Sequence, residues 1–229
     1  APSPPPSPAP APSTTRPSGN APTLTGDPLQ QGIELLTHSR SPKRRSGARR
    51  LRKLGDPAAG PALLAALEAE VRDVRTWETQ YQLIMAVGEC RTTAAAPLLR
   101  QLVDAGFGEP MVHIALGDAL LRLGHAEGRT DEVFDELLGE AWSFHLDGAT
   151  RALAMLRLPL RRDLLDHLLD RVQATSHGEL QGVNPWFWAA AACPGWLDLS
   201  PRVRPFLEEA GRSALGQVRS AAEAALLGK

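Results

Sequence analysis

Six acidic residues recur every three or four positions in two segments: Glu132, Glu136 and Glu140, then Asp163, Asp166 and Asp170. On a helix, each set lies on one face, opposite a stripe of apolar residues. Like charges at these spacings cost roughly 0.2–0.5 kcal/mol per pair. The pattern therefore indicates either a binding surface for a cationic partner or a hydrated surface that is partly paired with Arg161, Arg162 and Arg171.

An aromatic cluster is the second candidate. It consists of Trp186, Phe187, Trp188 and Trp196, which include three of the chain's five tryptophans. Asn184 and Pro185 are suited to begin a helix there. Residues two apart on a helix point to different sides, so Trp186 and Trp188 cannot both face one core, and one is expected to be exposed. The cluster is either an aromatic anchor for a partner or bulky filling between packed helices.

A basic segment is the third candidate, since Arg40 to Lys53 holds eight basic residues and no acidic one. We name its central part the basic collar: Lys43, Arg44, Arg45, Arg49, Arg50, Arg52 and Lys53. From Leu54 onward, 24 acidic residues outnumber 16 Lys and Arg, so the total charge of −1 conceals this asymmetry. Such a segment contacts nucleic acid or an anionic membrane surface, or forms a solvated helix face.

Catalytic and metal chemistry have little support in the sequence. None of the six histidines has a metal-ligand spacing to another His, Cys or acidic residue, and Cys90 and Cys193 form no C-x-x-C pair. No apolar run reaches the ~18–20 residues of a membrane helix. We predict no catalytic residue, no cofactor, no metal and no transmembrane segment.

The elements that position these residues form a repeat. The stretch "LRKLGDPAAGPALLAAL" from Leu51 recurs in degraded form from Ile84, Leu120 and Leu153. A period of this length with two apolar stripes indicates stacked helix pairs, because neither helix of a pair can bury its apolar face alone.

A glycine column accompanies the repeat. Gly55, Gly88 and Gly124 are spaced 33 and 36 residues apart, and Arg157 occupies the column 33 residues further on. The column coincides with the expected end of each first helix, where a left-handed cap residue is least costly as glycine.

The segment "KRRSGARRLRKLGDPAAGPALLAAL" resembles the bacterial HEAT-like repeat grouped with phycobilisome-lyase repeats. The resemblance extends over about residues 42 to 229 and is weakest near Trp186. It implies an all-α fold, a right-handed α-solenoid of about five helix pairs plus a closing helix. In such solenoids the second helices usually line the concave face, which would place the two acidic sets in a groove.

The expected helices follow from this register. A leading helix spans 28–38 and a closing helix spans 214–228. The first helices of the pairs centre on 43–54, 77–88, 110–123, 147–157 and 185–193, and the second helices on 58–72, 95–105, 131–140, 160–173 and 201–210. The two cysteines then lie three repeats apart, too far for a disulfide, so we expect free thiols and a cytoplasmic location.

Residues 1–28 are rich in Pro, Ser and Ala, and we expect a disordered tail or linker before a solenoid of residues 29–229. The tail is either a docking segment or tether, or a plain linker. The expected role of the chain is a non-enzymatic scaffold that binds a protein or peptide, more basic than acidic, in an acidic concave groove. Two alternatives remain: nucleic-acid binding through the basic collar, and a DNA-glycosylase-like or lyase-like activity.

Overall fold

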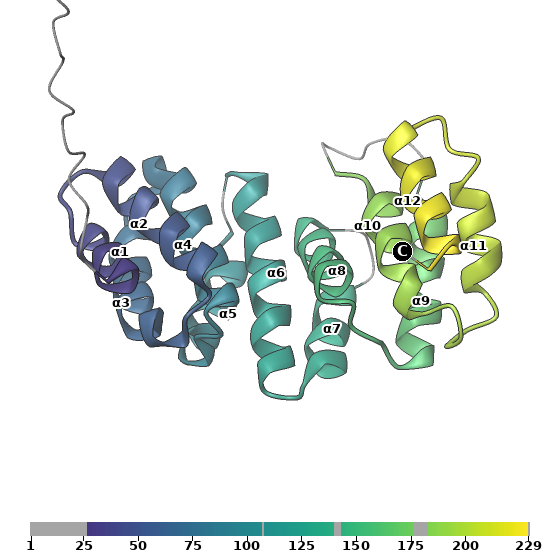
Figure 1. Cartoon of the computed structure of the whole chain (residues 1–229), viewed down its shortest axis with the longest axis horizontal. Helices are drawn as coiled ribbons and strands as arrows, with labels where there is room; N and C mark the ends of the chain where they lie inside the picture. Colours follow the sequence, from purple (N-terminus) through teal and green to yellow (C-terminus); the bar gives the residue numbers. More distant parts are fainter. Residues whose placement is uncertain (1–26, 107, 140–142, 176–182, 229) are drawn as a thin grey trace, which may run out of the picture.

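The computed structural model describes residues 27–106, 108–139, 143–175 and 183–228, which form a solenoid of helix pairs (Figure 1). The leading helix α1 (Pro28–Leu36) precedes five pairs. Their first helices are α2 (Ser41–Leu54), α4 (Trp77–Glu89), α6 (Pro110–Ala126), α8 (Phe144–Leu156) and α10 (Pro185–Ala192). The second helices are α3 (Gly60–Glu70), α5 (Ala96–Ala105), α7 (Thr130–Leu138), α9 (Arg162–Gln173) and α11 (Val203–Ala210), and α12 (Gly216–Leu226) closes the array. The predicted all-α repeat fold is therefore confirmed.

Local capping explains where several helices begin. The Asp27 carboxylate accepts a hydrogen bond from the Leu29 N–H at 3.1 Å, and Pro28 follows as the first helical residue of α1. Ser143 caps α8 through the Leu146 N–H, and Asn184 caps α10 through the Phe187 N–H. Because these signals are local, the expected helix boundaries lie within a few residues of those observed.

The glycine column has two different roles. Gly55 ends α2 with a φ of 62°, and Arg157 ends α8 with a φ of 52°, so the expected left-handed cap occurs at these two positions. At Gly88 and Gly124 the helices continue past the glycine, and the expectation of a cap is wrong there. A Cβ on Gly88 would lie 2.9 Å from the Cα of Ala119. These two glycines allow close packing instead.

The first helices pack against one another in sequence, from α1 on α2 through α4, α6, α8 and α10 to α12. The closest approach joins α6 and α8, where a Cβ on Gly117 would meet the His145 carbonyl oxygen at 1.9 Å. A Cβ on Gly148 would meet the Ile114 carbonyl oxygen at 1.9 Å as well. We call α2, α4, α6, α8, α10 and α12 the inner layer, and α3, α5, α7, α9 and α11 the outer layer.

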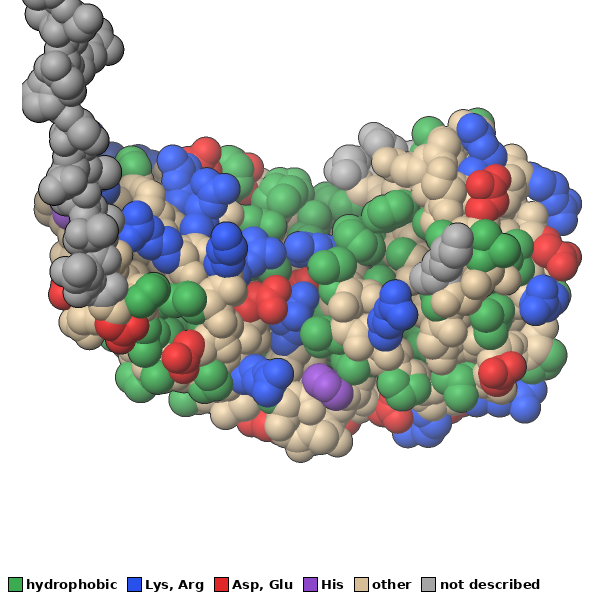
Figure 2. Space-filling model, in the orientation of Figure 1, with side chains coloured by type: hydrophobic (Ala, Val, Ile, Leu, Met, Phe, Trp, Pro, Cys, Tyr) green, Lys and Arg blue, Asp and Glu red, His purple; other side chains and the backbone are tan. Residues whose placement is uncertain are grey.

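The molecule is hollowed on the side of the inner layer. Figure 2 shows a hollow at the upper edge between α6 and α10, with hydrophobic side chains along it. The outer helices α3, α5, α7 and α9 lie along the opposite side (Figure 1). The expectation that second helices line the concave face is therefore wrong for this array, because close glycine contacts draw the first helices together.

Both cysteines are buried free thiols, as expected. In the described part of the chain, no helix is both long enough and apolar enough to cross a bilayer. The tail predicted for residues 1–28 lies outside the described residues except at Asp27 and Pro28, so its disorder stays a prediction.

Candidate functional site

The acidic residues lie on the outer layer, away from the hollow. Glu132 and Glu136 belong to α7, and Asp163, Asp166 and Asp170 belong to α9. Glu140 lies outside the described residues. These side chains therefore do not line a concave groove, in contrast to the prediction.

Arginines pair with all five described acidic residues: Arg129 with Glu132, Arg100 with Glu136, Arg161 with Asp163, Arg162 with Asp166, and Arg202 with Asp170. The Arg129 side chain lowers the pKa of Glu132, and the Arg202 side chain likewise lowers the pKa of Asp170. The repulsion that the sequence pattern implied is thus relieved within the chain itself.

The basic collar divides into two groups. Arg44 and Arg45 pair with Glu70 and Glu78. The other five cations are exposed or half-buried and have no carboxylate partner among the described residues: Lys43, Arg49, Arg50, Arg52 and Lys53. The collar therefore contains both a structural part and a free cationic part.

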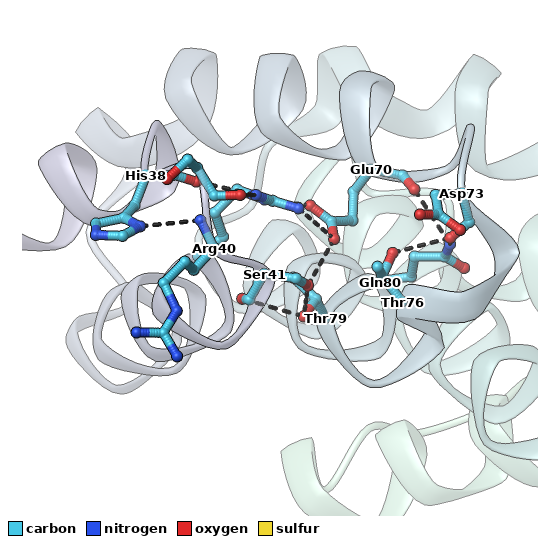
Figure 3. Close-up of polar contacts among 10 residues, drawn as sticks. His38, Arg40, Ser41, Glu70, Asp73, Thr76, Thr79 and Gln80 are labelled. Atoms are coloured by element: carbon cyan, nitrogen blue, oxygen red, sulfur yellow. Dashed lines mark hydrogen bonds and ion pairs between the residues drawn. The ribbon is translucent and has the colours of Figure 1, made fainter.

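Arg44 belongs to a polar network that joins α2, α3 and α4. Figure 3 shows its members Ser41, Glu70 and Thr79. The Nε of Arg44 donates to the Glu70 carboxylate at 2.5 Å, and the Ser41 hydroxyl donates to the same carboxylate at 2.9 Å. Gln80 donates to the backbone carbonyls of Glu70 and Asp73. Burial raises the pKa of Glu70, but hydrogen bonds from Arg44, Thr76 and Ser41 outweigh it and the net pKa is lowered. This arrangement stabilises the first repeat.

The two tryptophans of the aromatic cluster separate as expected. Trp186 is fully buried, stacks on Phe206 with ring centroids 5.0 Å apart, and donates from Nε1 to the Thr175 carbonyl. The prediction of Trp186 as a partner-binding residue is therefore wrong, because the core encloses it. Trp188 is half-buried and borders the hollow.

The hollow contains a pocket of about 350 Å³ that crosses the inner layer. Its wall includes Tyr81 of α4, Met111 and Ile114 of α6, Phe187 and Trp188 of α10, and Gln217 of α12. These side chains are exposed or half-buried. The sequence analysis found Phe187 and Trp188 in the aromatic cluster, whereas the others lie in three separate segments that only the stacking of helices brings together.

Charged and polar groups form the base of the pocket at α8 and α10. Arg151 lies 5.9 Å from the centre of the Trp188 ring, and its Nη1 lies 3.4 Å from the carboxylate of the fully buried Asp118. Asp147 and Asn184 also border the pocket and are buried. The pocket thus combines aromatic faces with hydrogen-bonding groups whose positions are held by the core.

In the part of the chain that the structure describes, we find no comparable centre for nucleophilic or metal chemistry. Burial and the nearby charges of Asp56 and Glu89 raise the pKa of the Cys90 thiol to about 11, and burial also raises the pKa of Cys193. The thiolate is therefore scarce at neutral pH at both positions. Among the described residues, no group of three or more His, Cys, Asp and Glu side chains is arranged to hold a metal ion.

Residues 43–69, which cover α2 from its third residue, the following turn and nearly all of α3, match the family model of the PBS lyase HEAT-like repeat. This segment is similar to the HEAT-like repeat family. The predicted family resemblance is confirmed here, and the later helix pairs stack in the same solenoid. No curated protein matches the chain significantly.

Solved structures with similar helix arrangements are repeat proteins. A designed armadillo repeat protein is 16% identical, with a TM-score of 0.41 over 87% of this chain and 99% of that one. A computationally designed armadillo repeat protein for modular peptide recognition is 17% identical, with a TM-score of 0.43 over 87% of this chain and 99% of that one. The similarity to both proteins concerns the arrangement of helices alone.

Proposed function

We propose that the protein is a non-enzymatic scaffold that binds an extended peptide segment of a partner in the hollow of the inner layer. The pocket across α4, α6, α8, α10 and α12 is the observation that supports this proposal. Tyr81, Phe187 and Trp188 offer large apolar surfaces at a low cost in side-chain entropy, which is typical of residues that dominate binding energy.

An extended segment suits the dimensions of this surface better than a compact ligand does. Five inner helices contribute to the pocket. With packed helices about 8–10 Å apart, the surface measures roughly 35 Å across, which is the length of about ten extended residues. Hydrogen-bonding groups at the base, such as Arg151 and Asn184, would orient the peptide backbone while the aromatic side chains contact its side chains.

A selection from a random peptide library tests this proposal. We expect the enriched peptides to bind the parent chain and to lose at least ~10-fold in affinity on the double substitution of Tyr81→Ala and Trp188→Ala. The matched control is the double substitution of Glu132→Gln and Glu136→Gln on the outer layer, which should leave binding unchanged. Circular dichroism of each variant would verify that the fold is retained.

The opposite result would support the earlier expectation of a basic partner on the acidic surface. In that case, enriched peptides would be rich in Lys and Arg, would bind the aromatic variant normally and would lose affinity for the glutamine variant. The ion pairs of the outer layer weaken this expectation, because arginines of the chain already neutralise the acidic side chains.

The free cations of the collar favour one second candidate, contact with a polyanion such as nucleic acid. Lys43, Arg49, Arg50 and Lys53 are all exposed on α2. Affinity for random duplex DNA should then fall steeply with salt, and replacing Arg49, Arg50 and Lys53 with Gln should reduce the salt slope. Binding that is weak and independent of these substitutions would exclude this function.

A further inference from the structure

The pocket of the inner layer contains a buried hydrogen-bond donor without a partner. Asn184 is 7% exposed and borders the pocket. Its Oδ1 accepts the Phe187 N–H at 3.2 Å and caps α10, whereas its Nδ2 has no partner among the described residues. Buried donors are nearly always satisfied in folded proteins, because an unmade hydrogen bond costs the full desolvation of the group. An acceptor on a ligand would complete this hydrogen bond after a small movement of the pocket wall, because Nδ2 is itself enclosed.

The rest of the pocket indicates the same kind of ligand. Tyr81, Arg151 and Gln217 add further donors around the Trp188 and Phe187 rings. A proline-rich segment complements this combination, since each prolyl unit has a free carbonyl acceptor and no backbone N–H donor. In the polyproline II conformation, the carbonyls make no internal hydrogen bonds, and prolyl rings pack well against aromatic grooves.

The chain itself carries such a segment. Residues 2–12 read "PSPPPSPAPAP", with seven prolines in eleven residues and no charged side chain. This neutrality matches a pocket whose guanidinium, that of Arg151, is already paired with Asp118. An anionic peptide would gain less there, because this guanidinium is used within the protein.

The connecting sequence is long enough to reach the pocket. Fourteen residues lie between Pro12 and Asp27, where the described structure begins. At ~3.1 Å per residue in extended polyproline geometry, they span up to about 45 Å. The inner layer advances by about 8–10 Å per helix, so Tyr81 on α4 and Trp188 on α10 lie roughly 20 and 45 Å from α1 along the array.

We propose that residues 2–12 of the chain occupy the pocket formed by Tyr81, Asn184 and Trp188, as a tethered ligand that competes with the partner peptide. This inference rests on the proposed function, because it assigns an occupant to the same pocket. A tether of this length holds its ligand at an effective concentration on the order of millimolar. Even a weak contact would then close the pocket until a partner with higher affinity displaces the segment.

A competition experiment on the full chain tests the proposal. The probe is a labelled synthetic peptide of residues 1–16, followed by fluorescence anisotropy. In the tail variant, serine replaces five prolines in the otherwise complete chain: Pro4, Pro5, Pro6, Pro8 and Pro10. We expect the probe to bind the tail variant at least ~10-fold more tightly than the parent chain, whose own segment competes.

Two further substitutions in the tail variant locate the binding site. Asn184→Ser keeps an oxygen that can cap α10 but removes the amide donor, so α10 should stay folded while probe affinity falls. Trp188→Ala should also reduce probe affinity, whereas Glu136→Gln on the outer layer should not. Equal melting temperatures of the variants would show that the loss of binding is not a loss of fold.

Several outcomes would overturn the proposal. Equal probe affinity for the parent chain and the tail variant, or no binding to the tail variant, would exclude residues 2–12 as the tethered occupant. A concentration-dependent dimer in sedimentation that disappears in the tail variant would show that the segment binds a second copy instead. If the tail variant still binds library peptides in a Trp188-dependent manner, the proposed function stands and only the occupant is wrong; if it binds neither, both fail.

Discussion

Ion pairs join neighbouring repeats in both layers, but they differ in burial. In the inner layer, Asp118 is fully buried, and its partners Arg122 and Arg151 have side chains that are 7% and 18% exposed. In the outer layer, Arg100 and Glu136 are 38% and 46% exposed. A buried pair is screened little by water or salt, whereas an exposed pair adds little to stability. Removing one partner of the buried pair should therefore cost much more stability than removing one partner of the exposed pair.

The largest effect should follow from breaking the inner pair. Asp118→Ala removes the carboxylate partner of Arg151 and one of the two carboxylates that pair with Arg122. We expect a loss of roughly 3–5 kcal/mol in the free energy of unfolding. Urea denaturation followed by circular dichroism would measure it. A loss below ~1 kcal/mol would mean that the buried ion pair of the inner layer matters no more for stability than the exposed pair of the outer layer.

A second effect concerns the histidines of the inner layer. The Nδ1 of His113 and the Nε2 of His145 lie 2.9 Å apart. Burial, with a smaller contribution from His113, lowers the pKa of His145 from 6.5 to about 4. Below pH 6.5 the unfolded chain takes up a proton at His145 that the folded chain takes up only near pH 4. Stability should therefore be lost as the pH falls through this window. The full shift corresponds to about 3 kcal/mol, and solvent screening at this half-buried side chain reduces the expected loss to about 2 kcal/mol.

Comparison with His145→Gln isolates this effect, because carboxylates also protonate at the lower end of the window. The free energy of unfolding of the variant should decline less than that of the parent between pH 6.5 and pH 4. Parallel curves for the two proteins would contradict the assignment to His145.

The smallest effect should come from the outer layer. Glu136→Gln removes the ion pair with Arg100, whose side chains are both more than one-third exposed. We expect a change within about 0.5 kcal/mol that shrinks further at high salt. The same denaturation assay measures it, and a loss comparable to that of Asp118→Ala would remove the distinction between the layers.

Much of the fold was predictable from the sequence, because the signals are local. Gly55 ends α2, Asn184 and Pro185 begin α10, and the apolar stripes recur with the repeat. The inner ion pairs also leave a signal that sequence analysis missed. Arg45 and Glu78, Glu89 and Arg122, and Asp118 and Arg151 are each separated by 33 residues, one repeat period. Opposite charges at that spacing lie side by side once the helix pairs stack.

The candidate site could be predicted only in small part. Trp188 was found as one member of an aromatic pair, but its separation from the buried Trp186 depends on which face of α10 meets Phe206. Tyr81, Met111 and Gln217 carry no pattern of their own in the sequence and become neighbours only through stacking.

Helix boundaries and the repeat period follow from hydrogen bonds, capping residues and apolar spacing within about ten residues, so sequence alone predicts them. The side on which the array is hollowed depends on contacts between residues far apart in the chain. Gly117 and Gly148 let α6 and α8 approach until a Cβ would clash with a backbone carbonyl. Close packing of the first helices brings the inner layer together and leaves the acidic α7 and α9 on the opposite side. The spacing between helices sets the curvature of the array, and the sequence of a single helix does not encode that spacing.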